Sequence, residues 1–275
     1  MIEALQFEFM RNALLAGLLA SIVCGIIGTF VMVNRIVLVS GGIAHAAYGG
    51  VGLAFFFGFA PLWGILGFSL LVSFLMAAVS LRAKHRADTI IGVLWAVGMA
   101  LGIILMDLTP GYNVDLMSYL FGSILTVQQS DLLLMLGVDG LVILLVTYFY
   151  QDLVALSYDE EFARVRGVPA TLLYFVLMAM VALTAVMIIQ VVGLILVIAL
   201  LTIPPYIAER YSRSMLSMMV LSVCFNLFFT VAGLCLSYSF NLTSGASIIM
   251  VAATAFFLAL FVDRCRNWLR MIARS

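Results

Sequence analysis

Long apolar runs separated by short polar breaks dominate the pattern of hydrophobic and polar positions along this chain. Each run is close to the roughly 20 residues that an α-helix needs to cross the hydrocarbon core of a bilayer. The pattern predicts an all-α polytopic membrane protein with about nine transmembrane helices, near residues 12–33, 37–58, 62–81, 88–107, 132–150, 169–189, 191–207, 215–237 and 244–262. Eight or ten helices are the alternatives, because the pair of runs that meets at Gln190–Gly193 also fits one bent or partly re-entrant element.

The amino-acid composition also indicates that most of the chain lies in a lipid bilayer. Of the 275 residues, 65% are hydrophobic and 9% charged, whereas soluble domains average roughly 45–50% apolar and about 25% charged residues. The first run follows a segment in which Glu3 and Glu8 face a single basic residue, Arg11, so we interpret it as a retained helix and not a secretion signal.

The basic residues predict the orientation in the membrane. If the loop RAKHR (82–86) is cytoplasmic, strict alternation places 12 of the 13 Lys and Arg residues on that side, with only Arg11 outside. The outward loops DLTPGYNVD and SYSFNLTSG contain no Lys or Arg. The positive-inside rule therefore favours an outside N-terminus and an inside C-terminus.

Several classes of function are excluded by what the sequence lacks. Thirteen basic residues balance 13 acidic ones, so the chain lacks the excess of positive charge that is typical of nucleic-acid-binding proteins. The four cysteines show no CxxC spacing, so neither a disulfide framework nor a thiolate zinc site is indicated. Residues 1–275 form a single transmembrane domain without a Walker GxxxxGK[ST] motif. The chain is thus not predicted to be an enzyme, and ATP chemistry would need a partner.

His45 stands in the most Gly- and Ala-rich part of these runs, GGIAHAAYGGVG. On a helix, Gly41 and Gly42 lie one turn before it, and Tyr48 and Gly49 one turn after it. Small residues let helices approach closely, so we expect the imidazole to face packed protein. Two interpretations stay open. One is a structural histidine that donates an interhelical hydrogen bond; the other is a pathway residue, since intramembrane ionisable groups mark pathways and imidazole is a common metal ligand.

Three acidic residues are further candidates for contact with a cation. Asp88 follows the basic loop and either pairs with its Lys and Arg residues or lies on a transport route. Asp107 and Asp115 flank a Pro-Gly turn, and the run 116–125 that follows is too short to span, so it predicts a short helix on or in the outer side. These two carboxylates either attract a cation to an entrance or are solvated loop charges.

Two cytoplasmic segments are candidates for docking to a motor subunit, with ordinary solvated loops as the alternative. SYDEEFARVRGVP (157–169), which overlaps the connection 151–168, places acidic residues before basic ones, the order that a helix dipole favours. The segment 204–214 starts at Pro204-Pro205, where we expect the preceding helix to break.

Five landmarks in order resemble the membrane permease subunits of zinc, manganese and iron ABC importers, the ABC-3 family. The resemblance covers essentially the whole chain and depends on the order and spacing of all five. They are AHAAYGGVGLAF (44–55), DTIIGVLWAVGMALG (88–102), VDLMSYLFGSIL (114–125), SYDEEFARVRGV (157–168) and VVGLILVIALLTIPPYIAERYSRS (191–214).

The resemblance implies a type II-like importer permease in a bacterial or archaeal cytoplasmic membrane. It implies a homodimer that works with a cytoplasmic ABC ATPase and an extracytoplasmic metal-binding protein. ATP would act on the ATPase, and the cargo would be Zn²⁺, Mn²⁺ or Fe²⁺. IPPYIAERYSRS is similar to the coupling segment of cobalamin and iron-siderophore permeases, which makes Tyr206, Glu209, Arg210 and Arg213 candidates for the ATPase contact.

One departure from the family pattern affects the choice of metal. Family members commonly carry an aspartate one turn before the histidine, in a D-x-x-x-H arrangement that sets both ligands on one helical face. Here Gly41 takes that position, so His45 carries over without its carboxylate partner. A site with fewer carboxylates favours zinc over manganese, and we expect zinc as the leading cargo.

Two other functions fit parts of the pattern. A stand-alone channel or secondary transporter needs no ATPase, but it predicts several buried ionisable groups at mid-membrane, of which His45 is the clearest here. An ABC permease for a metal chelate, such as cobalamin or a ferric siderophore, would share the coupling-like segment and need a wider path.

Overall fold

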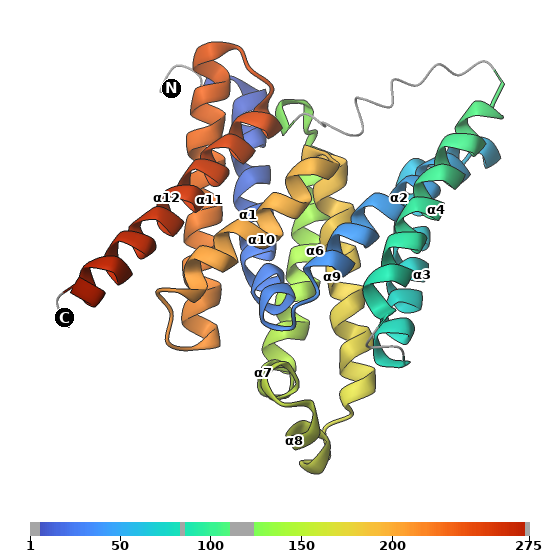
Figure 1. The fold of residues 1–275 in the computed structure, drawn as a ribbon. Coiled ribbons are helices and arrows are strands. Elements are labelled where there is room, and N and C mark those ends of the chain that lie inside the picture. The colour runs from blue at the N-terminus through green and yellow to red at the C-terminus, as the bar shows by residue number, and fades with distance from the viewer. Residues whose placement is uncertain (1–5, 83–85, 111–123, 273–275) are drawn as a thin grey trace.

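A computed structural model describes residues 6–82, 86–110 and 124–272, with side chains left undescribed at 190–191 and 266–272. Within these ranges the chain is helical and forms a bundle whose termini lie at opposite ends (Figure 1). The helices are α1 (Glu8–Val33), α2 (Val37–Phe57), α3 (Pro61–Arg82), α4 (Ala87–Asp107), η3 (Ile124–Thr126), α6 (Gln129–Tyr148), α7 (Tyr150–Tyr158), α8 (Glu160–Val165), α9 (Ala170–Val192), α10 (Leu194–Glu209), α11 (Met215–Phe240) and α12 (Ser244–Ile272).

Each of the nine predicted apolar runs forms a helix. Eight of the described helices are long and apolar enough to cross a membrane, and the ninth, α10, has 16 residues. The pair at Gln190–Gly193 is two helices, because Gly193 adopts φ 91° and ψ 167° between them. Only glycine adopts that conformation readily, so a single residue makes the break. The short helix predicted over 116–125 falls mostly outside the described residues.

Glycines bring α2 into backbone contact with its neighbours α3 and α4. A methyl group added at Gly102 of α4 would lie 2.3 Å from the Tyr48 carbonyl oxygen of α2, and one at Gly98 would lie 2.8 Å from the Ala46 Cα. Gly50 and Gly64 make a similar contact between α2 and α3. In lipid, the hydrophobic effect does not drive helices together. The close backbone contact stabilises the helix packing through van der Waals attraction instead.

The predicted helix break at Pro204-Pro205 is wrong. Both prolines lie inside α10, which continues to Glu209. Pro205 offers no N–H to the Leu201 carbonyl one turn earlier, the usual reason for a break. That carbonyl packs against α1, where a methyl group on Gly28 would lie 2.7 Å from its oxygen. Packing against neighbouring helices lets a transmembrane helix keep internal prolines.

The connection 151–168 folds into α7 and α8, and α8 lies at the far end of the molecule from the N-terminus (Figure 1). Asp159 caps α8 by accepting a hydrogen bond from the Phe162 backbone N–H at 3.0 Å. Glu160 in the first turn pairs with Arg164 in the last turn at 2.6 Å. The acidic-to-basic order in the sequence therefore stabilises a short helix, as predicted.

Candidate functional site

His45 lies on α2 with its ring stacked on the indole of Trp95 from α4. The ring centroids are 4.3 Å apart and the ring planes differ by 12°. The histidine is half-buried, and its flanking residues Ala44 and Ala46 are fully buried. The expectation that this imidazole faces packed protein is therefore met, and its neighbour is an aromatic ring.

The histidine makes no interhelical hydrogen bond through Nδ1. That nitrogen is buried and has no hydrogen-bond partner among the described residues. Gly41, one turn earlier, offers no side chain that can reach it, and a methyl group there would lie in ordinary contact, 3.5 Å from Ile198 Cδ1. A buried nitrogen without a partner is costly unless something else satisfies it, which favours a functional role over a purely structural one.

Trp95 is held by its own helix. Its indole N–H donates a hydrogen bond to the Met99 sulfur at 3.1 Å, one turn further along α4. The two helices meet at Gly98, between these residues, where α4 touches the backbone of Ala46. The sequence analysis did not identify Trp95. The available signal was its spacing from Gly98 in VLWAVGMALG, since residues three apart lie on the same face of a helix and a glycine can mark a close helix contact.

The predicted acidic candidates do not join His45. Among the described residues, no group of three or more His, Cys, Asp or Glu side chains is arranged to hold a metal ion. Asp88 and Asp107 stand at opposite ends of α4, and both are exposed. Asp115 lies outside the described residues. Of the predicted metal candidates that the structure describes, His45 alone is thus partly buried, between fully buried neighbours.

A polar cavity of about 300 Å³ lies where α2, α3, α4, α7, α8 and α9 meet. Asp88 from the start of α4 and Glu160 from α8 line it, together with Arg35 and Tyr174. Ile91, another lining residue, lies one turn before Trp95 on α4. The cavity therefore lies beside the His45–Trp95 pair, towards the end of the molecule that carries α8.

The candidate coupling residues at the end of α10 divide into two groups. Arg210 forms an ion pair with Asp263 of α12, and it also donates a hydrogen bond to the Tyr206 hydroxyl at 2.6 Å and packs over that ring. Glu209 and Arg213 are exposed. Arg210 and Tyr206 thus connect α10 to α12 within the subunit, whereas the other two are accessible.

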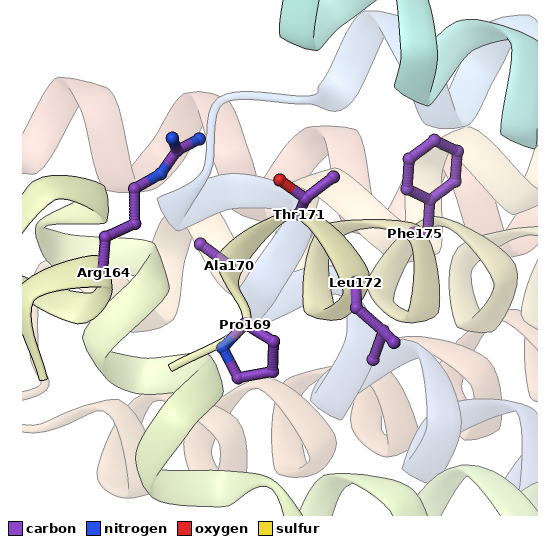
Figure 2. A pocket seen from close by; sticks show the side chains of 6 residues that line it. All are labelled: Arg164, Pro169, Ala170, Thr171, Leu172 and Phe175. Atoms are coloured by element: carbon purple, nitrogen blue, oxygen red, sulfur yellow. The ribbon is translucent and has the colours of Figure 1, made fainter. Parts of the chain in front are cut away.

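A larger open recess of about 580 Å³ lies where α8 leads into α9. Figure 2 shows its lining, with the Arg164 side chain extending from α8 beside the first turn of α9 and Phe175 further along that helix. Most of the lining is apolar, and the recess adjoins α8, which projects beyond the bundle.

Sequence reasoning also missed Asp139 in the middle of α6. Its side chain is 3% exposed, and neither carboxylate oxygen has a hydrogen-bond partner among the described residues. The available signal was simple, because it is an acidic residue inside the apolar run 132–150. A buried carboxyl group in a membrane helix is costly and commonly functional.

The chain is similar to membrane proteins of metal transport systems along almost all of its length. The profile of the ABC 3 transport family matches residues 6–263. The uncharacterized membrane protein slr2045 of Synechocystis sp. is 52% identical, covering 96% of this chain and 94% of its own. The manganese transport system membrane protein MntC of Halalkalibacterium halodurans is 32% identical, covering 94% and 89%. The structure of PsaBC from Streptococcus pneumoniae in complex with Fab superposes with a TM-score of 0.86 at 34% identity, covering 98% of both chains.

Proposed function

The chain belongs to the ABC 3 transport family, as a multi-pass membrane permease subunit of an ABC metal importer, and we propose that its cargo is manganese ahead of zinc and iron. The observation that carries this order is the similarity over nearly the full length to a relative named for manganese transport. The expectation of zinc rested on Gly41 alone, and nothing in the relatives supports it. As a permease subunit, the chain depends on a partner for ATP hydrolysis.

The test is transport by the assembled complex. The permease, its ATPase and its binding protein are reconstituted in liposomes, and uptake of Mn²⁺, Zn²⁺ and Fe²⁺ is compared with ATP and with a non-hydrolysable analogue. We expect ATP-dependent uptake that is fastest for Mn²⁺. Faster uptake of Zn²⁺ would establish zinc as the cargo. Uptake that persists without ATP would instead indicate a channel or a secondary transporter, for which Asp139 would be the first residue to test.

We propose that the cation passes His45. The imidazole is half-buried between the fully buried Ala44 and Ala46, and no hydrogen-bond partner of its buried Nδ1 lies among the described residues. The cavity lined by Asp88 and Glu160 is our candidate for the cytoplasmic exit, since it lies beside this pair of helices. Asp107, the last residue of α4, and Asp115, which follows it eight positions later in the sequence, are our candidates for the outer entrance.

We propose that the ATPase contacts two segments, 151–168 and 204–214. The projection of α8 beyond the bundle and the open recess beside it support the first. The exposure of Glu209 and Arg213 supports the second. Tyr206 and Arg210 would act through the ion pair to α12 instead of by direct contact.

The proposed assembly is a homodimeric permease with a cytoplasmic ABC ATPase and an extracytoplasmic metal-binding protein. Purification of the tagged chain in mild detergent, with mass spectrometry of the proteins that accompany it, tests this directly. A stoichiometric ATPase and a mass of two permease copies are the expected results. A chain that is well folded and free of an ATPase would overturn the assignment of both docking segments.

A further inference from the structure

We infer that Trp95 is a positioning residue for the passing cation: it fixes the plane of the His45 imidazole and stabilises the ring while a metal ion is bound to it. The inference rests on the proposed role of His45 in the pathway. It adds to His45 of α2 a residue of α4 that the sequence analysis did not single out.

The geometry allows stacking and metal binding at the same time. A metal ion binds an imidazole nitrogen in the plane of the ring, whereas the indole covers a face of the ring at a centroid separation of 4.3 Å. The near-parallel planes, 12° apart, prevent the imidazole from rotating freely about its side-chain bonds. Trp95 therefore restricts the directions from which a cation can be bound without blocking either nitrogen.

The indole is itself fixed from two sides. Its N–H is bound to the Met99 sulfur, and its helix is pressed against α2 by the contact of Gly98 with the Ala46 backbone. Because both anchors lie within one turn of the stacked pair, the pair moves only if α2 and α4 separate. The orientation of the histidine is thus built into the packing of the two helices.

Stacking on the indole also stabilises the metal-bound imidazole at a site where Gly41 replaces the aspartate that is common in the family. Metal binding leaves positive charge on the imidazole, and tryptophan offers the most favourable aromatic face for a cation. Among the described residues, no group of three or more His, Cys, Asp or Glu side chains is arranged to hold a metal ion, so His45 does not belong to a complete protein ligand set there. An aromatic face stabilises the charged ring without adding a ligand to the metal, so the ion can still leave, as transport requires.

The experiment uses Trp95 as its own reporter. The sequence contains three tryptophans, at 63, 95 and 268, so a variant with Trp63→Phe and Trp268→Phe keeps Trp95 alone. The purified permease–ATPase complex in lipid nanodiscs is titrated with Mn²⁺, a paramagnetic ion that quenches nearby indole fluorescence. We expect saturable quenching that His45→Ala abolishes. A matched variant that keeps only Trp63, an exposed residue of α3, should not respond.

Two substitutions separate positioning from packing. Trp95→Phe keeps an aromatic face and should retain the apparent Mn²⁺ affinity of uptake within about twofold, whereas Trp95→Leu should weaken it about 3- to 10-fold. Equal effects of the two variants, or quenching that survives His45→Ala, would overturn the inference. ATP-driven uptake by the wild-type complex is the control for the proposed function. If this uptake is present but the Trp95 emission does not change when Mn²⁺ is added, the role of Trp95 is overturned and the proposed function is not.

Discussion

The contact of α2 with α4 and the contact of α10 with α12 are built in opposite ways. The first has almost no side chains between the backbones, since Gly98 and Gly102 touch Ala46 and Tyr48 directly. The second consists of side chains: the Arg210–Asp263 ion pair, and the rings of Tyr206 and Phe256 with centroids 5.0 Å apart. His45, the proposed pathway residue, lies at the backbone contact of α2 with α4. One of the two proposed ATPase segments adjoins the side-chain contact of α10 with α12.

The difference has a physical meaning for an importer. Backbone contact through glycine has few alternative arrangements, so α2 and α4 move as one unit and keep His45 against Trp95. An ion pair at the end of a helix bundle can exchange partners at a lower cost. We therefore expect steric changes to be decisive at α2–α4 and changes of charge to be decisive at α10–α12.

The largest effect should come from Gly102→Val. The first added carbon would lie 2.3 Å from a backbone oxygen that cannot move without α2. Overpacking usually costs about 1–3 kcal/mol, and a clash with backbone exceeds that range. We expect little monodisperse protein after detergent extraction, measured by size-exclusion chromatography. Gly92→Val on the same helix is the matched control, because a methyl group there meets nothing within 4 Å. Equal yields of the two variants would contradict the rigid contact.

His45→Ala should strongly reduce transport without disturbing assembly. Loss of a metal-binding imidazole should lower uptake at limiting external Mn²⁺ by about tenfold or more. Because the residue is half-buried and no hydrogen-bond partner of its Nδ1 lies in the described part of the chain, the bundle should still form. Uptake in proteoliposomes and co-purification of the ATPase measure the two properties separately. Unchanged uptake would remove His45 from the pathway.

Arg210→Glu should loosen the α10–α12 contact and, with it, the ATPase. The substitution places a second acidic group beside Asp263, which is largely buried by its ion pair. Breaking a buried ion pair costs about 3–5 kcal/mol and an exposed pair contributes about 0–1 kcal/mol. The cost for this partly buried pair should lie between these values and should appear as a lower melting temperature and weaker ATPase co-purification.

The reversed pair, Arg210→Glu with Asp263→Arg, distinguishes the two explanations of that result. Recovery of both stability and ATPase binding would show that Arg210 acts within the subunit. Recovery of stability alone would show that the guanidinium also contacts the ATPase. If the single variant already binds the ATPase normally, Arg210 has no part in coupling.

Much of this architecture was predictable because it depends on local properties. Nine helices follow from the length and hydropathy of the runs, and α8 follows from its acidic-to-basic charge order. The errors lie where a distant helix decides the outcome. Pro204 and Pro205 stay in α10 because α1 packs against the affected carbonyl, and Trp95 meets His45 only through the contact of two helices. Hydropathy alone reports neither of these lateral contacts.

The smallest expected effect, and the finest test of the contrast, comes from Gly41→Asp. Unlike the glycines that touch α4, Gly41 has room, since a methyl group there would lie 3.5 Å from a flexible Ile198 side chain. The new carboxylate would stand one turn from His45, on the same face of α2. Carboxylate oxygens suit Mn²⁺ better than softer metals, so the ratio of Mn²⁺ to Zn²⁺ uptake should rise a few-fold. Gly41→Asn has the same size without the charge and should leave the ratio unchanged. If Asn raises it as much as Asp, a change in packing and not a new ligand is responsible, and α2 is less rigid than its glycine contacts indicate.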